Sequence, residues 1–111
     1  MRPSDKTTIF NKIRLCDNEV SACFCHYRTI LGDERIAVAQ QAATNYAKTK
    51  AQAFFSDNVQ FFESEDNRTD FFKYISAINA DEANSGKRFS KELYKLVCSY
   101  AKQMEEEKEN I

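Results

Sequence analysis

Apolar residues in the first thirty positions recur with the period of a helix. From Ser4 to Leu31 their spacing alternates between four and three residues, at Ile9, Ile13, Cys16, Val20, Cys23, Tyr27 and Ile30. A strand would instead alternate at every second residue, so the pattern predicts one helix over residues 5–31. Phe10, Phe24 and Leu31 lie beside this seam and widen it, which means that the helix needs at least two neighbours.

A helical hairpin is predicted at Gly32 and Asp33, because glycine commonly follows a helix and a carboxylate favours the start of the next one. The apolar stripe of the second helix is first small and then aromatic: Ile36, Ala39, Ala43, Ala47, Ala51, Phe54, Phe55, Val59, Phe61 and Phe62. The residues Ser56-Asp57-Asn58 compete with a helix for backbone hydrogen bonds. Since Phe54 and Phe61 stay in phase across them, we expect a single helix over residues 33–63.

Two shorter helices follow a polar run at residues 64–70. One is predicted over residues 69–83 and the other over residues 89–107, before an acidic C-terminal tail. Their inner faces carry Phe71, Tyr74, Ile75 and Ile78 in the first, and Phe89, Leu93, Leu96, Val97, Tyr100 and Met104 in the second. Two long and two shorter helices predict an all-α fold, a single-domain antiparallel four-helix bundle over residues 1–111.

The composition narrows the classes of protein to consider. The 111 residues suffice for one domain, and only two Gly and one Pro exclude sandwiches and glycine-rich phosphate loops. A net charge of −1 draws the chain neither to nucleic acid nor to an anionic membrane. There is no apolar run of membrane-spanning length and no secretory signal, and three of the four cysteines fall within ten residues. We therefore expect a cytoplasmic protein with reduced thiols and no membrane partner.

The sequence does not indicate enzymatic chemistry. Hydrolysis needs a nucleophile beside a base, or two convergent carboxylates, whereas the acidic residues here fall in loops, helix starts and the tail. The run Cys23-Phe24-Cys25-His26 contains thiols and an imidazole, which are the ligands that zinc prefers. On a helix, however, Cys23 and Cys25 point about 200° apart, and Cys16 lies about 10 Å further along the axis. We expect no enzyme activity, no metal and no other cofactor.

The single histidine, His26, lies beside the seam, where one ring edge reaches solvent. The run Cys25-His26-Tyr27-Arg28 resembles, over this short stretch, the motif around the phosphoacceptor of histidine-phosphotransfer domains, which are four-helix proteins of similar length. Arg28 matches the basic residue that follows the histidine. Tyr27 is bulkier than the motif allows, and Gly32 ends the helix here. The resemblance implies a phosphotransfer role for His26.

A basic stripe lies on the side of the last helix opposite its apolar face. At 100° per residue Lys91, Lys95 and Lys102 share this side, and Lys87 and Arg88 enter it from the loop. Such a stripe can follow a phosphate backbone or line an acidic protein surface, although it has no interleaved aromatic residue to stack a base. A solvated helix face produces the same pattern.

Adjacent aromatic pairs are the other distinctive feature, at Phe54-Phe55, Phe61-Phe62 and Phe71-Phe72. Neighbouring helical residues diverge by 100°, so both members of a pair cannot face one narrow stripe. We expect Phe55, Phe62 and Phe72 to border a surface patch that binds a protein. A wide aromatic core that buries both members is the alternative.

Together these features predict a small non-enzymatic helical protein-binding module, of the inhibitor, immunity or antitoxin, chaperone or assembly-subunit type. Its partner would be another protein or a second copy of the chain. The alternatives are a nucleic-acid-binding protein that uses the basic stripe, and a histidine-phosphotransfer protein that uses His26.

Overall fold

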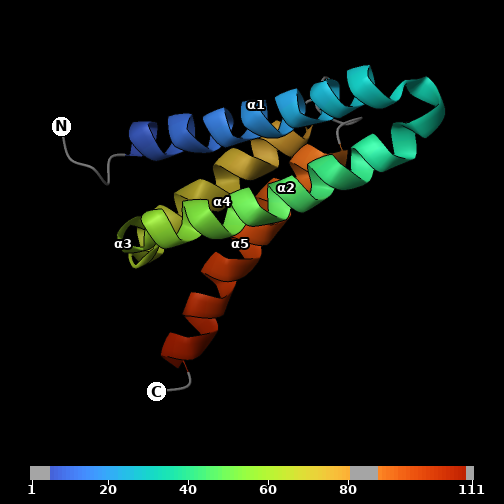
Figure 1. Cartoon of the computed structure of the whole chain (residues 1–111). Helices are drawn as coiled ribbons and strands as arrows, with labels where there is room; N and C mark the ends of the chain where they lie inside the picture. The colour runs from blue at the N-terminus through green and yellow to red at the C-terminus, as the bar shows by residue number, and fades with distance from the viewer. Residues whose placement is uncertain (1–5, 81–87, 110–111) are drawn as a thin grey trace.

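The computed structural model describes residues 6–80 and 88–109 and is helical almost throughout (Figure 1). Its elements are α1 (Lys6–Leu31), the 3₁₀ turn η1 (Asp33–Arg35), α2 (Ile36–Asp57), α3 (Val59–Phe62), α4 (Glu65–Ala80) and α5 (Arg88–Glu109). Within the described ranges only Gly32, Asn58, Glu63 and Ser64 lie outside a helix. The predicted all-α class is confirmed. The predicted end of the third helix, at residue 83, lies outside the described residues.

The chain turns sharply between α1 and α2 at Gly32. This residue has φ 82°, in the left-handed region that glycine enters without strain, and its N–H donates to the Arg28 carbonyl at 2.9 Å. The Arg28 side chain bonds Asp33 across the turn at 2.9 Å. α1 and α2 consequently lie side by side and run in opposite directions (Figure 1).

Asn58 interrupts the second helix, so the prediction of one helix over residues 33–63 is wrong. The Asn58 side chain is buried, and its Nδ2 donates to the Phe54 carbonyl at 2.7 Å. Lys12 donates to Asn58 Oδ1 at 3.4 Å from α1. The side-chain amide competes with the helical backbone pattern, which ends α2 at Asp57 and lets the one turn of α3 take its own direction.

The helix predicted to start at residue 69 begins four residues earlier, at Glu65. The Ser64 hydroxyl accepts a hydrogen bond from the Asn67 N–H at 3.3 Å, which caps the helix start. The polar run that looked like a loop in the sequence is thus the first turn of α4.

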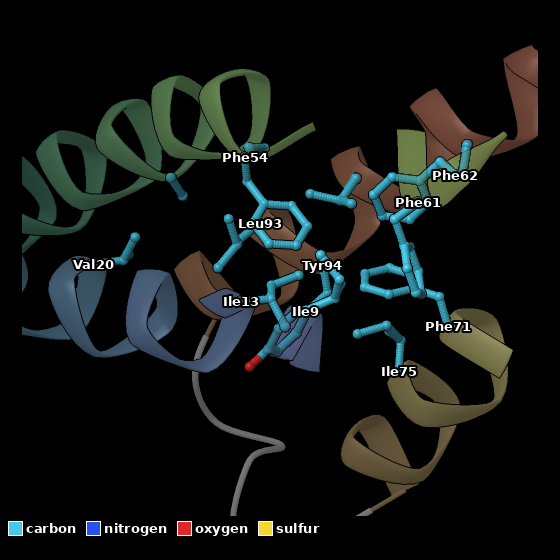
Figure 2. Packing of buried hydrophobic residues seen from close by; sticks show 14 of the residues in the cluster. Ile9, Ile13, Val20, Phe54, Phe61, Phe62, Phe71, Ile75, Leu93 and Tyr94 are labelled. Atoms are coloured by element: carbon cyan, nitrogen blue, oxygen red, sulfur yellow. The ribbon is translucent and has the colours of Figure 1, made fainter. Parts of the chain in front are cut away.

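The core is aromatic at one end and built on small residues at the other. Figure 2 shows Phe54, Phe61, Phe62 and Phe71 packed beside side chains from α1, α4 and α5. Phe62 is fully buried, with its ring centroid 5.0 Å from that of Phe71. The expectation that Phe62 borders the surface is wrong, because the break at Asn58 lets both Phe61 and Phe62 turn inward. Along α2, the buried alanines are Ala39, Ala43, Ala47 and Ala51, and they allow close approach of its neighbours.

Helix α5 packs mainly along α2 and makes fewer contacts with α1 and α4. Its C-terminal end extends past the other helices in Figure 1, as does the turn between α1 and α2 at the opposite side. Within the described ranges, every helix is too short or too polar to span a lipid bilayer.

Candidate functional site

An open groove of about 970 Å³ runs between α4 and α5. Its buried or half-buried lining includes Phe72 and Ile75 from α4 and Cys98 from α5. The lysines of the predicted stripe that have described side chains, Lys91, Lys95 and Lys102, also line it and are exposed. The stripe is therefore the charged wall of a groove. Lys87 lies outside the described residues, and of Arg88 only the backbone is described.

Phe72 lies against this charged wall. The Lys102 ammonium nitrogen is 5.7 Å from the centroid of the Phe72 ring, within the range of a cation–π contact. Along α5 alone the stripe has no aromatic residue, but α4 supplies one from across the groove. Two features that the sequence showed separately, the lysines and one expected surface phenylalanine, meet at one place.

The described side chains that line the groove carry a net positive charge. Three ammonium groups line it together with one described carboxylate, that of Glu92. The distance along α5 from Lys91 to Lys102 is about 16 Å at 1.5 Å per residue. This is the length of three helical turns.

Cys98 contributes apolar surface to the groove. Burial raises the pKa of the Cys98 thiol to about 11, although the Lys102 charge acts in the opposite direction. At neutral pH the thiol is protonated and weakly nucleophilic. The other cysteines, Cys16, Cys23 and Cys25, are free thiols as well. Cys98 thus contributes a protonated thiol to the lining of the groove.

Phe55 belongs to a different surface. It is half-buried between α2 and α5, with its ring centroid 5.5 Å from that of Tyr100, and it lines a small hollow of about 280 Å³ together with Met104. Tyr100 and Lys102 point about 200° apart on α5. Phe55 and Phe72 therefore lie on opposite sides of α5, and the three phenylalanines expected to share a patch do not.

Arg68 holds one end of the groove in place. Its side chain is 4% exposed, and its Nη1 donates to the carbonyls of Phe62 at 2.7 Å and Glu63 at 3.2 Å. Its Nε donates to the Glu105 carboxylate on α5 at 3.1 Å. One buried guanidinium thus satisfies the end of α3 and joins α4 to α5. Sequence reasoning missed it, because an arginine in a polar run gives no periodic signal.

His26 is exposed on α1, with its ring edge-on to Tyr27 at 5.5 Å between centroids. It does not line the groove. Across residues 6–80 and 88–109 the structure forms no cluster of three or more His, Cys, Asp or Glu side chains that could hold a metal ion. The described contacts of His26 therefore give the phosphotransfer interpretation no further support.

A second exposed apolar surface lies near the turn between α1 and α2. Tyr27 and Ile30 from α1 and Val38 from α2 are exposed there, Ile30 by 64%. Tyr27 and Ile30 belong to the seam that the sequence predicted for α1, but no α1 residue after Val20 is buried. These apolar side chains lie near exposed charged residues of the same turn, Arg28 and Asp33, and none of the three lines the groove.

No model of a known protein family, no curated protein and no solved structure matches this chain.

Proposed function

We propose that this protein is a non-enzymatic binding module whose α4–α5 groove receives an acidic segment of a partner protein. The observation that carries the proposal is the convergence of Lys91, Lys95 and Lys102 with Phe72 in one groove. An acidic amphipathic segment would place carboxylates against the ammonium groups and apolar side chains against Phe72. Charge complementarity of this kind favours fast and specific association.

The proposal also includes a scaffold, a cellular location and a type of protein. We propose an antiparallel four-helix bundle as the scaffold, supported by the opposite directions of α1 and α2 (Figure 1). A cytoplasmic location is supported by the four free thiols, which a reducing compartment preserves. We propose that the module is of the inhibitor, immunity or antitoxin, chaperone or assembly-subunit type.

Nucleic acid is a second candidate partner, because three lysines spaced over about 16 Å could also follow a phosphate backbone. Two features favour a protein instead. Glu92 places a carboxylate among the lysines, and Phe72, which is half-buried with Lys102 over its ring, leaves little surface for a stacked base.

The test is comparative affinity capture from the native cell with three forms of the protein. The first is the wild type, and the second is the groove variant Lys91→Gln/Lys95→Gln. The third is Arg35→Gln/Lys48→Gln, which removes two exposed charges from the α1–α2 hairpin and serves as the matched control. Exposed charges contribute little to folding, so all three should be equally stable.

We expect to find proteins that bind to the wild type and to the control but not to the groove variant. Nuclease treatment should not release these proteins. An identical set of proteins on all three forms would contradict the proposal. Loss of the captured material on nuclease treatment would favour the nucleic-acid candidate.

A further inference from the structure

The exposed side of α5 changes the sign of its charge along its length. Lys91, Lys95 and Lys102 lie on the groove side, and Glu106 follows them within a sector about 60° wide at 100° per residue. Glu109 comes three residues later in the sequence. One helix thus presents a basic segment followed by an acidic one.

The acidic segment lies where a second molecule can reach it. The C-terminal end of α5 extends past the other helices (Figure 1), and Glu106 and Glu107 are exposed. Its other acidic residue with a described side chain, Glu105, is 36% exposed and has one carboxylate oxygen on Arg68. The carboxylates lie within residues 105–109. These residues span about 6 Å of helix, the same length as Lys91–Lys95, so the acidic end can face that part of the groove.

We propose that the acidic end of α5 from a second copy of this chain occupies the groove, and that the exchange is reciprocal. In an antiparallel pairing of two α5 helices about a two-fold axis near Tyr100, Lys95 of each copy lies opposite Glu106 of the other. Lys91 then lies at the level of the last turn of the second copy's α5, which contains Glu109 in the sequence. A parallel pairing would place like charges together along the whole helix, whereas the antiparallel pairing does so only at the two Lys102 side chains near the axis, so charge favours the antiparallel arrangement.

This proposal rests on the proposed function, since it names the acidic segment that the groove receives. The ion pairs form at an exposed surface, where each contributes little and is screened by salt. Self-association is therefore weak and salt-sensitive, and a better acidic partner displaces the second copy. Self-association and partner binding compete for the same groove.

A charge exchange between two variants tests the reciprocal pairing. Lys91→Glu/Lys95→Glu makes the groove acidic and leaves the tail acidic. Glu106→Lys/Glu109→Lys makes the tail basic and leaves the groove basic. Sedimentation velocity from about 1 μM to about 1 mM, in about 50 mM and about 500 mM salt, measures the association of each variant, of the wild type and of the equimolar mixture. Circular dichroism checks that each variant is helical.

We expect the wild type to dimerise in low salt and to dissociate at least about tenfold more readily in high salt. Each variant alone should be monomeric, and the mixture should form a heterodimer. A wild type that stays monomeric at the highest concentration would overturn the proposal. So would a dimer that either variant retains, or a mixture that stays monomeric. The proposed function fails separately, if capture does not depend on Lys91 and Lys95.

Discussion

Replacing Arg68 by methionine should destabilise the protein more than any surface substitution in the groove. The guanidinium donates to the carbonyls of Phe62 and Glu63 and to the carboxylate of Glu105, and it is buried at the junction of α3, α4 and α5. Methionine fills a similar volume but donates no hydrogen bond. The variant therefore removes the donors and preserves most of the packing.

The loss in the free energy of unfolding depends on which hydrogen-bond acceptors lose their donor. A buried polar group without a partner costs about 1–3 kcal/mol, and the Phe62 carbonyl is the buried acceptor of the set. The Glu63 bond is only part-buried, so its loss costs less. Glu105 is 36% exposed and can be solvated, so its loss adds little. Together these contributions give about 2–4 kcal/mol, a large share of the ~5–15 kcal/mol by which small domains are stable.

The assay is urea unfolding followed by circular dichroism at 222 nm, with Glu105→Gln as the matched control. Glu105→Gln removes the charge of the pair and retains a carbonyl acceptor for Arg68, so it should cost less than about 1 kcal/mol. If Arg68→Met is within about 0.5 kcal/mol of the wild type, the buried guanidinium does not hold this junction. If Glu105→Gln costs as much as Arg68→Met, the ion pair and not the carbonyl bonds provides the stability.

Three further predictions concern the core and its titratable groups. Phe62→Ala should cost about 3–5 kcal/mol in the same unfolding assay and half-buried Phe55→Ala clearly less, and equal losses would refute the different burial of the two rings. Burial and the 2.7 Å hydrogen bond from the Tyr94 hydroxyl to Asp17 raise the pKa of Tyr94. Because only the unfolded tyrosine then ionises near pH 10, the free energy of unfolding should fall as the pH rises above about 10, and fall less in Tyr94→Phe; parallel pH profiles of the two proteins would contradict this. Iodoacetamide should label exposed Cys25 at least about tenfold faster than Cys98, whose pKa is about 11, and peptide mass spectrometry that finds equal rates would refute the burial of Cys98.

The helical periodicity in the sequence predicts the fold class, because residues that must be buried recur on one face. It does not predict how far each helix is covered. Val20 and Ile30 occupy the same seam of α1, yet Val20 is buried and Ile30 is exposed, since no residue of α1 beyond Val20 is enclosed by the other helices. The length of a seam is a property of one helix, whereas burial depends on the length of its neighbours.

The aromatic pairs show a second limit of sequence reasoning. Phe62 would point outward only if one helical axis ran from residue 33 to residue 63. The buried amide of Asn58 breaks that axis, and the competition was visible in Ser56-Asp57-Asn58, but its outcome depends on Lys12 and on the space in the core. Local propensity identified the residues at which the helix could break, and tertiary packing determined that it does break there.

The candidate groove was likewise predictable from the sequence only in part. Periodicity placed Lys91, Lys95 and Lys102 on one side of α5, because that inference needs only one helix. That Phe72 of α4 lies against Lys102 depends on the relative position of two helices, which is set by the packing of the shared core. No pattern within either helix contains that information.

The most direct test of the central claim, that the α4–α5 groove binds acidic protein segments, is a nuclear magnetic resonance titration. The ¹⁵N-labelled protein is titrated with a synthetic peptide of residues 98–111, used as an acidic amphipathic segment, and the backbone amide shifts are followed. We predict that the shifts concentrate at residues 72–79 and 91–102 and diminish in high salt. Shifts centred on the exposed apolar surface of Tyr27, Ile30 and Val38, or no shifts at all, would contradict it.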